Sequence, residues 1–126
     1  PEVEANPYSL EEVVLNLLNN ARDAVETHSG LDGPPGVTLR TDVERRESGD
    51  VVLLEVQDNG PGISEEILAR IWDPFFTTKD PDKGTGLGLP IARSIVEEFG
   101  GELSLVTEVG KGTKAVVSLP AAADTD

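Results

Sequence analysis

The sequence predicts a two-layer α/β sandwich, in which three helices cover one face of a mixed, mostly antiparallel sheet. Two observations carry this prediction. Apolar residues recur at helical spacing in some segments, and they alternate or run together in others, as helices and strands require. These segments follow the order helix, two strands, helix, loop, helix, two strands. A short turn between the members of each strand pair favours antiparallel hairpins, on which the helices can pack.

The first predicted helix spans residues 9–27, about five turns. Ser9 and Glu12 fit the capping box S-x-x-E and indicate its start. A break rich in glycine and proline over residues 29–36 ends it. The apolar positions that define its buried face are Leu10, Val13, Val14, Leu17, Leu18, Ala21, Ala24 and Val25.

The two strand pairs are expected to be hairpins. In the first, the alternating residues 37–43 predict a half-buried strand, and the apolar run 51–56 predicts its more buried neighbour. In the second, strands at about 102–108 and 113–119 are joined through Gly110-Lys111-Gly112.

Two further helices are expected between the hairpins. Ser64 is a suitable cap for a short one, because its side chain can accept from the first helical amides. Prolines and glycines predict a loop over residues 74–88. The last helix covers residues 89–99 and ends at Gly100-Gly101.

The chain is long enough for one domain with a buried core. Residues 1–120 are expected to form it, with part of the first strands of the sheet missing, and residues 121–126 to be a frayed tail. The sequence begins at Pro1 and holds no Met, which indicates a piece of a longer protein. It has no cysteine for a disulfide or a thiolate metal site, and no apolar stretch near the roughly 20 residues of a membrane span.

Acidic residues dominate the charge: 24 Asp and Glu against 10 Lys and Arg give a formal net charge of −14. Nucleic-acid phosphates and anionic lipids both require a basic surface. We therefore expect no nucleic acid as a partner and no direct contact with a membrane.

Asn16, Asn20 and Asp23 lie four and three residues apart, which places them on one face of the first predicted helix, opposite its apolar face. They could simply form a solvated polar face. Asparagine is a poor helix former, however, and its amide oxygen suits Mg²⁺, a hard cation that takes oxygen ligands. The residues alone leave both interpretations open.

The run Asp58-Asn59-Gly60-Pro61-Gly62-Ile63 directly follows an apolar strand. It could be an Asn-Gly turn of a hairpin, but a helix start follows it instead of a strand. Glycines permit close approach of the backbone to a flat ligand, and an aspartate can accept a hydrogen bond from an exocyclic amine.

Alternating glycines in Lys83-Gly84-Thr85-Gly86-Leu87-Gly88-Leu89 lead into the last predicted helix. Their N–H groups are free to point at an anion, and the helix N-terminus adds partial positive charge, as a phosphate site requires. The spacing is neither that of a Walker A loop nor that of a Rossmann fingerprint. A flexible hinge is the alternative interpretation.

Taken together, five motifs in this order resemble the catalytic, ATP-binding domain of sensor histidine kinases, within the superfamily shared by DNA gyrase, the Hsp90 chaperones and MutL. The similar segments are residues 14–21 for the N box, 58–63 for the first glycine box, 72–79 for the F box, 84–89 for the second glycine box and 110–113 before the last strand. The short lid and the Phe-Phe-Thr-Thr-Lys run are most similar to the branch of nitrogen-regulatory sensor kinases.

The resemblance implies a Bergerat-type fold that binds ATP and Mg²⁺. In it, Asp58 would hold the adenine amine, and Thr113 would support the same contact through water. Gly60, Gly62 and Ile63 would shape this pocket.

The same resemblance assigns the metal and the phosphates. Asn20 would bind Mg²⁺, Asn16 would help to hold the metal and phosphates, and Lys79 would meet the β and γ phosphates. The resemblance makes these three residues, Asn16, Asn20 and Lys79, the catalytic residues. Residues 76–87 would form the ATP lid. The backbone around these phosphates would come from Gly84, Thr85, Gly86, Leu87 and Gly88. The chain departs from the family at one position, because many members carry Lys or Arg where this chain has Asp23. Neutralisation of the phosphates would therefore depend more on Lys79.

The implied activity is that of a protein-histidine kinase. The γ-phosphoryl would pass to a histidine on a separate dimerisation domain of the same protein, and from there to the receiver domain of a response regulator. His28, the single histidine, is expected to be a surface residue instead. The chain would be a cytoplasmic monomer and the parent protein a homodimer.

Asn16 separates two readings within the superfamily. Members that hydrolyse ATP carry Glu at this position, and an amide is not a general base. An ATP-dependent conformational switch or ATPase is the alternative function, and an interaction module that no longer binds nucleotide is a third.

Overall fold

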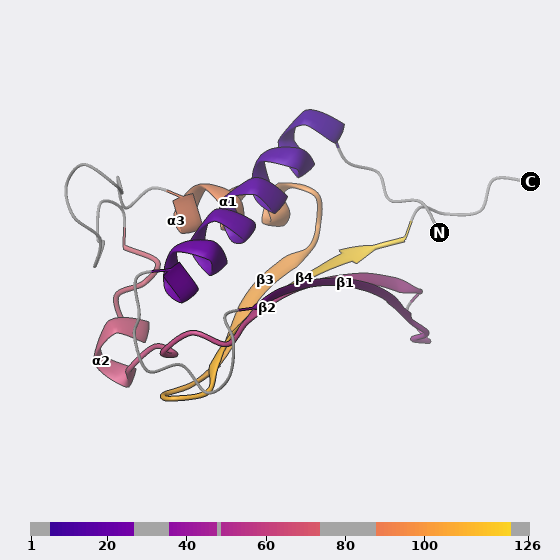
Figure 1. Ribbon diagram of the computed structural model, residues 1–126. Helices are drawn as coiled ribbons and strands as arrows, with labels where there is room; N and C mark the ends of the chain where they lie inside the picture. The colour runs from indigo at the N-terminus through magenta and orange to yellow at the C-terminus, as the bar shows by residue number, and fades with distance from the viewer. Residues whose placement is uncertain (1–5, 27–35, 48, 74–87, 122–126) are drawn as a thin grey trace, which may run out of the picture.

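The computed structural model describes residues 6–26, 36–47, 49–73 and 88–121. Figure 1 shows two layers, with α1 and α3 over one face of a sheet and α2 beyond one end of it. None of the helices in the described part of the chain is both long enough and apolar enough to cross a membrane. The elements, in the predicted order, are α1 (Pro7–Glu26), β1 (Val37–Glu44), β2 (Val51–Asp58), α2 (Glu65–Leu68), α3 (Gly88–Glu98), β3 (Glu102–Glu108) and β4 (Gly112–Pro120).

The sheet has the strand order β1-β2-β4-β3, and all three pairings of these described strands are antiparallel. Both predicted hairpins, β1–β2 and β3–β4, are therefore confirmed, and the sheet contains no parallel pair among the described strands. The central pairing joins the two hairpins and sets Asp58 of β2 opposite Thr113 of β4. This register brings the first glycine loop and the start of the last strand to the same end of the sheet.

Helix α1 begins two residues before the predicted start. The side-chain oxygen of Asn6 accepts the N–H groups of Tyr8 at 2.9 Å and Ser9 at 3.3 Å, so Asn6 is the N-cap. Pro7 takes the first helical position, where its missing N–H costs nothing. The prediction that Ser9 caps this helix is wrong, because Asn-Pro provides a complete start signal three residues earlier.

The other helix ends agree with the sequence. The Ser64 hydroxyl accepts the N–H of Ile67 at 3.4 Å and caps α2 as predicted. Helix α3 ends at Glu98, and the chain then turns through Gly100 with φ +79° and the amide of Gly101 bonded to the Val96 carbonyl.

The core lies between the helices and the sheet. Helix α1 packs on β1 and β2, and α3 packs on β3 and on α1. Strand β1 is less buried than predicted: only Val43 is partly covered, and Leu39 on the same face remains 48% exposed. The reason is its edge position, where α1 covers β1 less than it covers β2. The buried apolar residues of the core cluster are Val13, Leu17, Ala21, Val56, Ala92, Val96, Leu103, Ala115, Val117 and Leu119.

Candidate functional site

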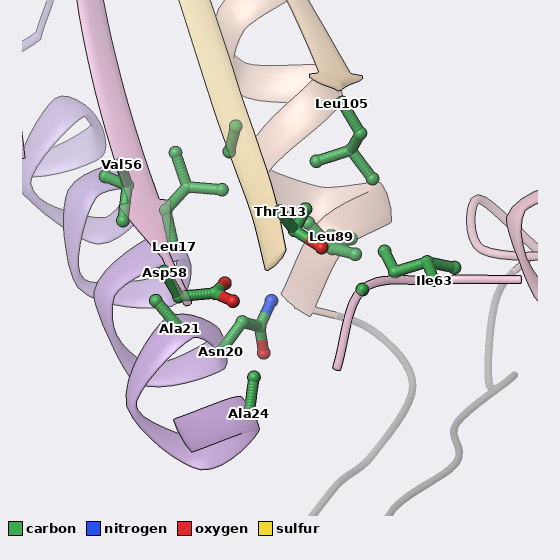
Figure 2. Close-up of a pocket in the computed structure, with 12 residues that line it drawn as sticks. Leu17, Asn20, Ala21, Ala24, Val56, Asp58, Ile63, Leu89, Leu105 and Thr113 are labelled. Atoms are coloured by element: carbon green, nitrogen blue, oxygen red, sulfur yellow. The ribbon is translucent and has the colours of Figure 1, made fainter. Parts of the chain in front are cut away.

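A pocket opens at the end of the sheet where β2 stops and β4 begins (Figure 2). Its volume is about 110 Å³. Among the described residues, three polar side chains line it, those of Asn20, Asp58 and Thr113, and the other lining residues are apolar or glycine. These other lining residues are Leu17, Ala21, Ala24, Val56, Gly62, Ile63, Leu89, Leu105 and Ala115.

The periodicities of α1 and β2 place two of the polar groups. Side chains alternate along a strand, so Asp58 projects to the same helix-covered face as the buried Val56. Residues three and four apart share one face of a helix, which puts Asn20 on the same side of α1 as Leu17 and Ala24. The prediction that Asn20 lies opposite the apolar face is therefore wrong. Figure 2 shows the carboxylate of Asp58 and the amide of Asn20 both directed into the pocket.

Asp58 is the one buried charged or polar residue within the described part of the chain, with 8% of its surface exposed. Burial raises the pKa of its carboxyl, and hydrogen bonds from the backbone amides of Gly60 and Thr113 act in the opposite direction. The Gly60 N–H lies 2.9 Å from Oδ1. Asp58 is thus a fixed hydrogen-bond acceptor at the edge of an apolar pocket.

The β3–β4 hairpin holds the loop that follows Asp58. The Gly110 N–H donates to the Pro61 carbonyl at 2.8 Å, and the Ile63 N–H donates to the Thr107 hydroxyl at 2.8 Å. Gly62, with φ +77°, lies so close to the hairpin that a β-carbon there would stand 2.3 Å from the Glu108 carbonyl oxygen. Only glycine fits this approach, which shapes one wall of the pocket.

Thr107 lies beside the pocket and contacts two residues that line it, Ile63 and Thr113, although no motif in the sequence pointed to it. It continues the alternation of Leu103 and Leu105 on the helix-covered face of β3. A hydroxyl at the end of such an apolar alternation is the signal that could have identified it.

Asn16 does not line the pocket, but its amide faces the beginning of α3. A β-carbon built on Gly88 would lie 3.8 Å from Asn16 Oδ1. Asn16 and Asn20, one helical turn apart, are both partly buried. Neighbouring residues therefore cover part of both side chains.

Part of the predicted site lies outside the described residues. This holds for the lid 76–87 and for His28. Within the described ranges, no group of three or more His, Cys, Asp and Glu residues could hold a metal ion. The site residues that fall outside these ranges are Lys79, Gly84, Thr85, Gly86 and Leu87.

Comparisons with known proteins match nearly the whole chain. The family described as histidine kinase-, DNA gyrase B-, and HSP90-like ATPase matches residues 5–123. The two-component sensor PprA of Pseudomonas aeruginosa is 48% identical over 90% of this chain and 12% of its own length. The sensor kinase CckA of Brucella abortus is 40% identical over 94% of this chain and 13% of its own length. The sensor histidine kinase ZraS of Escherichia coli K12 is 38% identical over 95% of this chain and 23% of its own length.

Among solved structures, full-length ShkA in complex with AMPPNP superposes with a TM-score of 0.70 at 29% identity, over 92% of this chain and 22% of that one. The chain thus spans less than a quarter of the length of each of these relatives. The predicted fold class and the resemblance to sensor histidine kinases are confirmed, and the nitrogen-regulatory branch stays a prediction. The chain belongs to the family of histidine kinase-, DNA gyrase B- and HSP90-like ATPases.

Proposed function

We propose that the chain is the ATP-binding catalytic domain of a two-component sensor histidine kinase. It binds Mg-ATP and donates the γ-phosphoryl group to a histidine on a separate dimerisation domain of the same protein. The observation that carries this proposal is the buried acceptor Asp58 at the mouth of an apolar pocket, in a chain of this family. The sensor kinases among its relatives support the same activity.

The pocket suits the base of the nucleotide. Its volume of about 110 Å³ is well below the roughly 300–1,000 Å³ of sites that enclose a whole ligand, so it would hold only part of a nucleotide, such as the base. Asp58 would accept a hydrogen bond from the exocyclic amine of adenine, and the side chains of Ile63, Leu89 and Leu105 offer apolar surface to the ring.

The phosphates would extend from the pocket toward Asn16 and the start of α3. The N-terminus of α3 at Gly88 carries partial positive charge, and the first N–H groups of a helix have no carbonyl partner within the helix, which favours an anion. Asn20 and Asn16 offer amide oxygens, a donor type that fits Mg²⁺, and this ion usually keeps waters and takes phosphate oxygens as further ligands. When bound, Mg²⁺ would neutralise charge on the phosphates. Lys79 and the backbone of residues 84–87 are proposed to complete this part of the site.

Asn16 favours transfer over hydrolysis. Its amide cannot remove a proton from water, so the domain would act by positioning the γ-phosphoryl group for a nucleophile supplied by another domain. A bond then forms between a histidine ring nitrogen and the γ-phosphorus while the bond to the β–γ bridging oxygen breaks, and ADP is released. A response-regulator receiver domain would take the phosphoryl group next. In this proposal the chain is a cytoplasmic monomer and its parent a homodimer.

Phosphotransfer in trans tests the proposal. The chain is mixed with the separately produced histidine domain of its parent, Mg²⁺ and γ-labelled ATP, and label is expected on the histidine domain. Asp58→Ala should abolish labelling, whereas Asp42→Ala, on the exposed face of β1, should not. Rapid phosphate release without labelling would instead support an ATPase or conformational switch. The absence of both labelling and ADP binding would indicate a module without nucleotide function.

A further inference from the structure

We infer that Thr107 is a positioning residue of the base pocket, which fixes the Thr113 hydroxyl as a hydrogen-bond acceptor toward the ligand. This inference deepens the proposed function and rests on it. Thr107 has no place among the lining residues of the pocket. It would act through its neighbours, and its effect would be to favour an amino group over a carbonyl at one position of the bound base.

The Thr107 hydroxyl is shared among three neighbours from two segments. Cross-strand pairing sets Thr107 of β3 directly opposite Thr113 of β4. Its Oγ1 accepts the N–H of Ile63 at 2.8 Å, lies 3.2 Å from the carbonyl oxygen of Gly112, and lies 2.9 Å from Oγ1 of Thr113. One hydroxyl thus joins the first glycine loop to the strand that carries Thr113.

One assignment of the protons makes all three contacts hydrogen bonds at once. A hydroxyl has one proton and two lone pairs. The Ile63 N–H uses one lone pair of Thr107. The carbonyl of Gly112 can only accept, so the Thr107 proton goes there. In this assignment the remaining lone pair of Thr107 accepts from Thr113 at 2.9 Å, so the Thr113 proton points to Thr107 and the lone pairs of Thr113 face the pocket.

The pocket therefore presents two acceptors side by side. Asp58 and Thr113 are paired across β2 and β4, and both line the cavity. An exocyclic amine has two protons and can satisfy both acceptors, directly or through a water that donates to one of them. A carbonyl at the same place offers no proton to these acceptors. In a 6-oxopurine the neighbouring N1–H can donate to only one of them, so one acceptor stays unsatisfied, which is a basis for discrimination.

Replacing Thr107 with valine would release the Thr113 proton. Thr113 could then donate to a ligand, and a carbonyl would become more acceptable in the pocket. Isothermal titration of the whole chain with ADP and with inosine diphosphate, which has a carbonyl in place of the amine, measures this as an affinity ratio in the presence of Mg²⁺. For Thr107→Val we expect the preference for ADP to fall about two- to tenfold, the size of one hydrogen bond.

The ratio of the affinities for ADP and inosine diphosphate distinguishes a positioning role of Thr107 from a purely structural one. A loosened glycine loop would weaken both nucleotides alike and leave their ratio unchanged. Thr107→Ser retains the hydroxyl and should keep the parent ratio. Thr41→Val makes the same chemical change on the exposed edge strand β1 and should keep it too.

Thermal unfolding establishes that each variant is folded, and Thr107→Ala gives the same comparison if the valine variant is not. An unchanged ratio in a folded Thr107→Val or Thr107→Ala variant would overturn the inference, while a parent preference for ADP would leave the proposed function standing. A parent chain that binds neither nucleotide would overturn both.

Discussion

Gly62 and Gly110 share a left-handed backbone, with φ of +77° and +84°, but differ in the space around them. A β-carbon on Gly110 would meet nothing within 4 Å. On Gly62 it would stand 2.3 Å from the carbonyl oxygen of Glu108 and 2.9 Å from the Cα of Val109, and these backbone atoms cannot rotate away. Alanine at the two positions therefore separates steric contact from backbone strain.

Backbone strain and steric contact together set the expected loss of stability in each variant. Left-handed backbone costs an alanine about 1–2 kcal/mol, partly offset by the lower entropy of its unfolded chain, so Gly110→Ala should lower the free energy of unfolding by about 1 kcal/mol. Gly62→Ala pays the same strain and must also displace the hairpin, which adds about 1–3 kcal/mol. We expect a total loss of about 3 kcal/mol, with weaker ADP binding because the pocket wall moves.

Urea unfolding followed by circular dichroism measures both losses, and titration with ADP measures the effect on the pocket. The matched variant Gly110→Ala retains the N–H that donates to Pro61, so it tests strain alone. Equal losses in the two variants, within about 0.5 kcal/mol, would refute the reasoning that the glycine loop is pressed against the β3–β4 hairpin.

Three further predictions concern the core, the buried carboxylate and the edge of α3. Leu17 is 2% exposed, and Leu17→Ala should lower the free energy of unfolding, measured with urea, by about 2–5 kcal/mol. Leu15 on the same helix is 50% exposed, and Leu15→Ala should lower it by about 0.5 kcal/mol or less. Similar losses in the two variants would contradict the assigned core. Burial raises the pKa of Asp58 above its ordinary value of 3.8, so the folded protein binds a proton at Asp58 more readily than the unfolded chain does. Proton binding therefore stabilises the fold at low pH, and this stabilisation is lost as the pH rises from 3.8 through the pKa of the folded state. Urea unfolding at several pH values should thus show Asp58→Asn gaining stability relative to the parent across that window, and a difference independent of pH would contradict the shift. Arg93→Ala removes a guanidinium 4.7 Å from the ring centroid of Trp72, and should change the Trp72 fluorescence and cost about 0.5–1 kcal/mol, whereas an unchanged spectrum would argue against the stacking.

The order of elements and both hairpins could be predicted because their signals are local. Apolar spacing and turn residues set helices and strands, and the capping residue Ser64 set the start of α2. Competition between local signals was harder to judge: Asn6-Pro7 and Ser9 both resemble helix starts, and the earlier one prevails. The exposure of β1 depends on which strand lies at the sheet edge, and alternation alone does not contain that information.

Only part of the site could be predicted from the sequence. Asp58, Asn20 and Thr113 were assigned from motifs that the resemblance supplied, and the structure brings them to one pocket. Thr107 escaped the sequence analysis because its contacts depend on strand register and on a loop distant in the chain. The alternation along β3 places the Thr107 hydroxyl on the helix-covered face, but it does not reveal that this hydroxyl contacts both the amide of Ile63 and the hydroxyl of Thr113.

The central claim is that the pocket beside Asp58 binds the base of ATP. Backbone amide spectra of the ¹⁵N-labelled chain, recorded during titration with ADP and Mg²⁺, test it most directly. The account predicts saturable shifts that are largest at Gly60, Ile63 and Thr113, with little change at Gly49 in the turn at the opposite end of β2. Unchanged signals for the pocket amides at saturating ADP, or shifts concentrated elsewhere, would contradict it.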